Sequence, residues 1–174
     1  IALRYDLTRY SLMKIDFDPQ TQSFGEPQMV VDAPARNKSI TLPRVSPDGR
    51  YVLYTEGDYG QFHIWHKSSD LWVKDLQADT CYALKQANSR DVDSYHSWSS
   101  NGRWIVFSSR RDDGRYTRLY FTHISQEGVA AKPFLMPQED PIEYYKELPY
   151  AYNVPDFINQ PIDVNSQSLG EGLL

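Results

Sequence analysis

SPDGRYVLY, residues 46–54, returns 53 residues later as SSNGRWIVF, residues 99–107. Each copy begins with a tight polar turn in which glycine takes a positive φ, and Pro47 fixes the φ of its own position in the first copy. The apolar run after each turn shows no polar alternation, which is typical of a strand buried on both faces. The two copies therefore predict equivalent β-hairpins in sheets that stack against each other.

A second block follows each hairpin. LWVKDL, residues 71–76, matches LYFTHI, residues 119–124, at an offset of 48 residues, and also matches LMKIDF, residues 12–17. Short polar turns, such as residues 18–25, lead from these blocks to fourth strands expected near residues 29–31, 82–84 and 134–136. Four short strands repeating at about 50 residues predict an all-β fold, a partial β-propeller of half a blade and two four-stranded blades. A two-sheet β-sandwich, the alternative, would not require the motifs to recur in register.

The repeats also give expected boundaries: a partial blade over residues 1–32 and whole blades over 33–85 and 86–137. Residues 138–164 are dense in proline and aromatic residues, which predicts an irregular arm packed on the propeller. The aromatic residues expected to pack are Tyr144, Tyr145, Tyr150, Tyr152 and Phe157. Residues 165–174 are expected to be flexible. Closed propellers need four or more blades, so the rest of the propeller is expected upstream of Ile1.

Composition and motifs narrow the functions that fit. A net charge of −5 argues against binding to a phosphate backbone, and no apolar run is long enough to span a membrane. Cys81 is the single cysteine, which excludes an internal disulfide and a thiolate zinc site. His63 and His66 would point opposite ways on an extended strand, and no ligand partners of suitable spacing accompany them. The nucleophile elbow, P-loop, zincin and EF-hand patterns do not occur, and we expect no cofactor and no metal.

The ordered set of turn, apolar strand and third strand, found twice, resembles the WD40-like (PD40) repeats of the TolB β-propeller family over about residues 3–137. Ser100-Asn101 stands where that family usually has Pro-Asp, which keeps the turn chemistry. The tail is similar to the C-terminal extensions of TolB-like envelope proteins of Bacteroides-type bacteria. The resemblance implies a periplasmic or cell-envelope protein that binds protein or peptide partners without catalysis.

The two rims of the expected propeller differ. The turns between first and second strands and between third and fourth strands share one rim and are short and polar, whereas the other rim carries long loops. The loop at residues 56–69 exceeds its counterpart by five residues and is rich in aromatic and histidine side chains, which are typical of a binding surface when arginine lies nearby. We therefore expect a binding site on this long-loop rim and its channel side, made by Tyr59, His63, Trp65, His66, His96, Arg110 and Arg111.

Two alternatives stay open. In the first, the loop aromatics only fill gaps between blades, and Arg110 and Arg111 pair with Asp112 and Asp113. The second is a different function, a fragment of a propeller-type glycan lyase or hydrolase, whose catalytic residues would lie largely in blades outside this sequence. Fold alone does not separate a binding module from such an enzyme.

Overall fold

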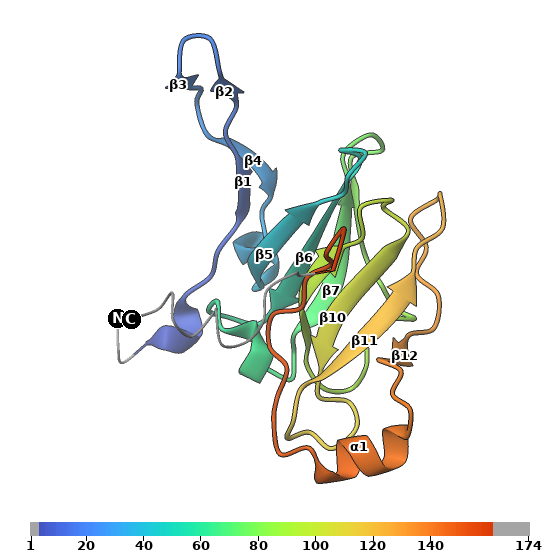
Figure 1. Ribbon diagram of the computed structural model, residues 1–174. Helices are drawn as coiled ribbons and strands as arrows, with labels where there is room; N and C mark the ends of the chain where they lie inside the picture. Colours follow the sequence, from blue (N-terminus) through green and yellow to red (C-terminus); the bar gives the residue numbers. More distant parts are fainter. Residues whose placement is uncertain (1–3, 162–174) are drawn as a thin grey trace, which may run out of the picture.

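The computed structural model describes residues 4–161 and contains two four-stranded antiparallel sheets within that range (Figure 1). The first sheet consists, in spatial order, of β5 (Ser39–Val45), β6 (Tyr51–Gly57), β7 (Asp70–Asp75) and β8 (Thr80–Ala83). The second consists of β9 (Asp93–Trp98), β10 (Trp104–Ser109), β11 (Arg118–His123) and β12 (Phe134–Leu135). Strand order follows chain order in both sheets, as in a propeller blade.

The register of the two sheets is equivalent. Tyr51 of β6 lies opposite Asp75 of β7, and Trp104 of β10 lies opposite His123 of β11 at the matching position. The first strand of each sheet also carries the same irregularity, because Leu42 (φ 56°) and Tyr95 (φ 45°) both adopt left-handed backbone at a register shift. A bulge bends its strand and leaves the extra residue without a partner across the ladder. The repeat in sequence is therefore a repeat in backbone geometry.

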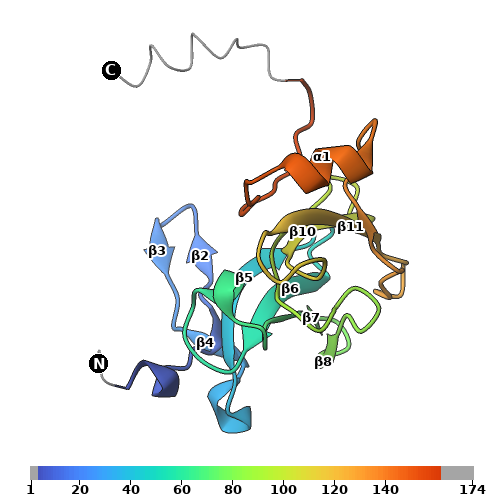
Figure 2. The same ribbon diagram turned by 90° about the horizontal axis from the view of Figure 1, so that it is seen from below.

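The sheets stack on each other and form the main core. One apolar cluster joins Leu53, Leu71 and Val73 of the first sheet to Ile105 and Phe107 of the second. All seven residues of β6 and five of the six residues of β10 are buried, as the continuous apolar runs of these second strands predict. Face-to-face stacking of consecutive four-stranded meanders is the arrangement of adjacent blades, and Figure 2 shows it from below. The prediction of a partial β-propeller is confirmed.

The N-terminal segment supplies the outer half of a further blade. After the 3-10 turn η1 (Tyr5–Leu7), β1 (Leu12–Lys14) pairs with β4 (Gln28–Val31), and their residues Leu12 and Val31 pack against Ile40 and Tyr54 of the first sheet. The prediction of one third strand over residues 12–17 is wrong in part, because the strand ends at Lys14. The expected short turn at residues 18–25 is also wrong, since β2 (Phe17–Asp18) and β3 (Ser23–Phe24) form a hairpin that projects from the sheets in Figure 1.

Side-chain hydrogen bonds explain why this segment closes as a hairpin. The Asp18 carboxylate accepts hydrogen bonds from the Gln20 amide at 2.8 Å and from the Thr21 hydroxyl at 2.9 Å. These hydrogen bonds stabilise a tight turn relative to an open polar loop. The Phe17 and Phe24 rings then face each other across the strands with centroids 5.0 Å apart. Both rings remain more than half exposed.

The C-terminal segment contains a helix that the sequence analysis did not anticipate. Asp140 is the N-cap of α1 (Pro141–Glu147), and its side chain accepts a hydrogen bond from the Glu143 amide at 3.0 Å. Pro141 occupies the first helical position, where its missing N–H costs nothing. The expectation of a wholly irregular arm is therefore wrong for these seven residues.

We define the C-terminal arm as residues 138–161, which include α1. Outside the helix, the arm lies on the face of the second sheet that points away from the first. Ser108 of β10 donates to the carbonyls of Tyr152 at 3.1 Å and Asn153 at 2.8 Å, and the Phe157 ring packs on Phe121 at 6.0 Å. Of the five aromatic side chains of the arm expected to pack on the propeller, Tyr150 is the one that stays mostly exposed, with 69% of its surface accessible. Residues 162–164 of the expected arm and the expected flexible residues 165–174 lie outside the described residues.

Candidate functional site

The long loop between β6 and β7 is fixed against the N-terminal segment. The Gly60 amide donates to the Thr8 carbonyl at 2.8 Å, and the buried Ser39 hydroxyl donates to the Gly60 carbonyl at 2.7 Å. The same hydroxyl accepts a hydrogen bond from the Tyr10 amide at 3.1 Å. The chain before β1 and the loop after β6 are thus held together as one surface.

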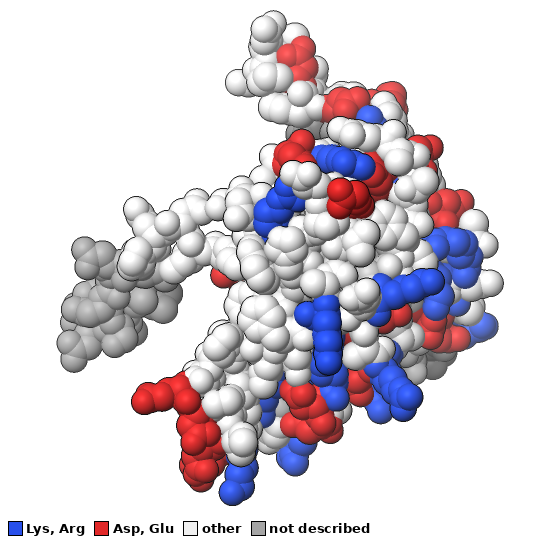
Figure 3. Space-filling model, turned by 90° about the vertical axis from the view of Figure 1, so that its right-hand side faces the viewer, with Lys and Arg blue, Asp and Glu red and all other residues white. Residues whose placement is uncertain are grey.

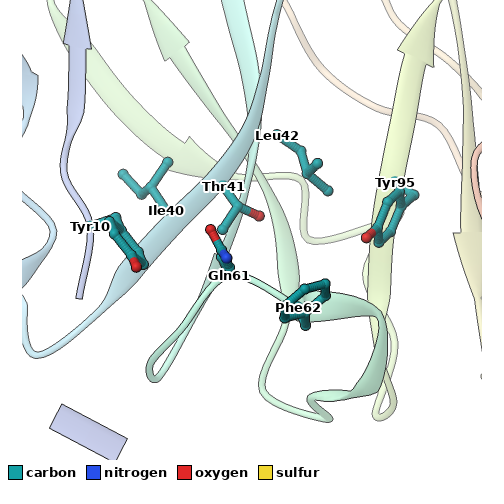
Figure 4. A pocket seen from close by; sticks show the side chains of 7 residues that line it. All are labelled: Tyr10, Ile40, Thr41, Leu42, Gln61, Phe62 and Tyr95. Atoms are coloured by element: carbon teal, nitrogen blue, oxygen red, sulfur yellow. The ribbon is translucent and has the colours of Figure 1, made fainter. Parts of the chain in front are cut away.

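A cavity of about 430 Å³ opens beside this junction (Figure 4). Its walls come from three places: the chain before β1, the innermost strands β5 and β9, and the long loop. Leu42 and Tyr95, the two residues at the repeated bulges, both line it. The full lining is Tyr10, Ile40, Thr41, Leu42, Gln61, Phe62 and Tyr95. Because the bulges re-aim these side chains, the backbone irregularity of the inner strands shapes the cavity.

A second cavity of about 250 Å³ adjoins the first and shares Tyr10, Gln61 and Phe62 with it. Tyr59 forms part of its wall, with its ring centroid 4.6 Å from that of His66 and 5.7 Å from that of Tyr5. Together the two cavities make one aromatic-lined depression, which we call the rim groove. It consists of Tyr5, Thr8, Tyr10, Ile40, Thr41, Leu42, Tyr59, Gly60, Gln61, Phe62, His66 and Tyr95.

Trp65 of the long loop pairs with Arg110, which follows β10. The Arg110 guanidinium lies 4.8 Å from the centre of the Trp65 ring, and 68% of the Trp65 surface is exposed. Two hydrogen bonds to the Arg115 carbonyl, at 2.7 and 3.1 Å, hold the guanidinium in place. A tryptophan with a pre-positioned arginine is the composition that dominates protein-binding hot spots.

Two of the residues expected on the rim, both histidines, are buried. His63 and His96 are 0% and 4% exposed, and burial lowers the pKa of each to about 4, with nearby His66 also contributing at His63. The His96 ring lies between the sheets, within 3.2 Å of the Leu53 carbonyl. His63 lies in the 3-10 turn η3 (His63–Trp65), not in a strand, so its ring is 5.6 Å from that of His66. Both buried imidazoles are neutral at pH 7 and serve packing.

Arg111 is partly buried, with 17% of its side chain exposed, and its contacts are internal. Its guanidinium donates to the Asp93 carboxylate at 2.6 Å and to the Ala87 carbonyl at 2.6 Å, and it lies against the rings of Phe107 and Tyr120. The expected alternative partners are wrong, because Asp112 accepts from the Tyr120 hydroxyl and Asp113 accepts amides of its own turn. Arg111 therefore neutralises a carboxylate that is 0% exposed.

The structure thus brings together Tyr59, Trp65, His66 and Arg110 at the surface. His63 and His96 are buried, and the guanidinium of Arg111 is held by internal partners. Sequence reasoning missed Tyr10 and Tyr95 because neither lies in the long loop. The only signal for Tyr95 was its position in the repeat, 53 residues after Leu42. Within residues 4–161, no three His, Cys, Asp or Glu side chains gather where they would hold a metal ion.

Charges of both signs are interspersed on the face shown in Figure 3. On this face such a pattern gives little long-range electrostatic steering. None of the helices in the described part of the chain is long and apolar enough to cross a membrane.

The fold and the rim groove define part of a β-propeller with a concave aromatic surface on one rim. No protein-family model matches the chain, and no curated protein does. Similar solved structures include TolB from Acinetobacter baumannii (15% identity, TM-score 0.46, covering 74% of this chain and 30% of that one). They also include the β-propeller domain of the Trilobed protease from Pyrococcus furiosus (14%, 0.42, 73% and 39%) and the tricorn protease (14%, 0.42, 76% and 11%). The chain spans well under half of each, and these values are too low to transfer any property from them.

Proposed function

We propose that this chain belongs to a non-catalytic β-propeller module that binds a protein or peptide through its long-loop rim. The observation that carries the proposal is the rim groove beside the exposed Trp65–Arg110 pair. Both features are preformed, the groove by the hydrogen bonds of Gly60 and the pair by the Arg115 carbonyl. Preformed contacts lower the ordering cost that a partner must overcome.

The chemistry of the surface favours a polypeptide partner. Phe62 is 64% exposed and Trp65 is 68% exposed, so each can bury a large apolar area on binding. Gln61 supplies both a donor and an acceptor beside them, which suits a backbone amide. The TolB-like repeats in the sequence support a periplasmic or cell-envelope setting for the partner.

Peptide-display selection against the immobilised chain tests the proposal. We expect peptides to be enriched, and the Phe62→Ala and Trp65→Ala variants should each bind them at least about tenfold more weakly, which is about 1.4 kcal/mol. Their melting temperatures should stay close to wild type because both side chains are mostly exposed. Val129→Ala is the matched control, since Val129 is 58% exposed but lies on the rim of tight turns. Peptides that bind both rim variants as tightly as wild type would contradict the proposal.

A further inference from the structure

The rim of tight turns carries a separate polar pocket of about 590 Å³ between the two blades. Both repeated turns line it, and each contributes the arginine that follows its glycine, Arg50 and Arg103. Ser125 and Gln126, from the turn after β11, complete one side. This pocket shares no residue with the rim groove, so a ligand bound in it would be independent of the proposed function.

In the first blade the arginine has a carboxylate partner. Arg50 donates to Asp75 from Nη2 at 2.9 Å and from Nε at 3.2 Å, and 6% of the Asp75 side chain is exposed. Asp75 lies opposite Tyr51, the residue after the arginine. A second acidic residue, Asp48, belongs to the same turn, where it accepts from the Ser46 hydroxyl and the Arg50 amide.

In the second blade both acidic residues are replaced. The residue opposite Trp104 is His123, so histidine occupies the position of Asp75. Asn101 occupies the position of Asp48 and keeps its role in the turn, since it accepts from Ser99 and from the Arg103 amide. The second blade therefore has two fewer negative charges at these positions and keeps the arginine of its turn.

Arg103 consequently has no ion pair and no side-chain hydrogen bond to any residue in 4–161. His123 does not take the place of the missing carboxylate, because its ring packs against Trp104 with centroids 5.2 Å apart. Two exposed acidic residues lie in the surroundings of Arg103. Asp48 lines the same pocket, and the pKa of Glu127 is lowered mainly by the Ser125 hydrogen bond and to a smaller extent by Arg103 and Arg50. Water screens this interaction strongly.

We propose that the pocket binds a peptide carboxylate, with Arg103 as its charged anchor. A guanidinium presents several N–H donors in a rigid fork that suits a carboxylate, and in the neighbouring blade Nε and Nη2 of Arg50 both donate to one oxygen, Oδ2, of Asp75. Gln126 and Ser100 offer further hydrogen-bond donors on the pocket wall. The carboxylate can come from an acidic side chain or from a chain terminus.

NMR titration of the ¹⁵N-labelled chain tests the site with three probes: the α-amide of N-acetylglutamate, N-acetylglycine and inorganic phosphate. We expect saturable shifts of the Gly102 and Arg103 amides with one or both carboxylates, and the comparison of the two identifies the source. Arg103→Met should abolish the shifts. Glu127→Gln should tighten binding severalfold because it removes the competing charge.

His123→Asp is the decisive variant because it rebuilds the arrangement of the first blade. The new carboxylate should pair with Arg103 and weaken probe binding at least about tenfold while the chain stays folded. Tyr120→Phe, on the same strand but outside the pocket, should leave the shifts unchanged. Wild-type binding by His123→Asp or by Arg103→Met, no saturation by either carboxylate, or preferential binding of phosphate would each overturn the proposal.

Discussion

Arg118 holds the C-terminal arm to the last blade, and its replacement by methionine should release the arm without unfolding the sheets. Only 4% of Arg118 is exposed, and its guanidinium donates to the carbonyls of Tyr150 at 2.6 Å and of Tyr145 and Leu148 at 3.2 Å. Two of these carbonyls lie at the C-terminal end of α1, where a helix presents unpaired carbonyls and partial negative charge. No carboxylate within residues 4–161 pairs with Arg118.

The magnitude can be worked from these three hydrogen bonds. A hydrogen bond to a charged group contributes about 1.5–3 kcal/mol, so their sum is a ceiling of several kcal/mol. When the arm opens, these carbonyls form hydrogen bonds with water, which offsets a large part of that sum. We therefore expect Arg118→Met to weaken docking of the arm by about 3 kcal/mol, which is about a 100-fold increase in the population of the open arm.

Hydrogen exchange at one amide reports this opening. The Tyr152 amide donates to the Thr117 carbonyl at 3.1 Å, a contact between the arm and the blade. Its exchange should accelerate about 100-fold in Arg118→Met, whereas amides of β6 should exchange as in wild type. Arg110→Met is the matched control, because the guanidinium of Arg110 contacts the Arg115 carbonyl and the Trp65 ring and not the arm. Unchanged exchange at Tyr152, or equal acceleration in β6, would refute this account of the arm.

Two further predictions concern stability. Burial lowers the pKa of His96 to about 4, so between about pH 6.5 and 4 the unfolded chain binds a proton that the folded chain excludes, and stability falls as the pH falls. Urea denaturation should show that wild type loses stability between pH 7 and 4.5 and that His96→Asn loses about 2–3 kcal/mol less over the same range. Identical pH profiles for the two proteins would contradict this. Gly128 and Gly49 both have positive φ, but a Cβ at Gly128 would clash with the Tyr82 hydroxyl, whereas nothing lies within 4 Å at Gly49. Gly128→Ala should therefore cost about 2–4 kcal/mol and Gly49→Ala about 1 kcal/mol by the same method, and equal losses would show that backbone strain alone decides.

The propeller fold was predictable because its main signals are local and occur twice. The turns at Gly49 and Gly102 and the apolar strands β6 and β10 each follow from nearby residue types, and the repeat places them in equivalent sheets. The helix α1 has a local signal too. Asp140 followed by Pro141 and, three residues after Asp140, by Glu143 is a helix start of the capping type. Proline breaks a helix at interior positions but is favoured at the first helical position. Pro141 occupies that first position, so the number of prolines alone was a misleading signal for this segment.

The site was less predictable because side-chain burial depends on contacts between blades. His96 and Arg111 look like binding residues in the sequence, but each has a distant partner, Asp93 for Arg111 at 18 residues and Leu53 for His96 at 43 residues. Nothing in the local sequence of Arg111 indicates that Asp93, and not the adjacent Asp112, is the buried carboxylate that needs it. Trp65 and Arg110 also come from different blades, yet the repeat placed them at matching loops, and that was sufficient to bring them together.

The composition of the rim groove determines how its function can be separated from the fold. Tyr10 precedes β1, Phe62 lies in the long loop, and Tyr95 belongs to β9, so the groove takes one wall from each of three blades. Its shape therefore depends on how the blades stack and not on the long loop alone. Transfer of residues 58–69 to another propeller should carry Trp65 with it but not the cavity, because Leu42 and Tyr95 contribute from bulged inner strands. A binding activity that survives such a transfer would belong to the Trp65 surface, and one that is lost would belong to the groove.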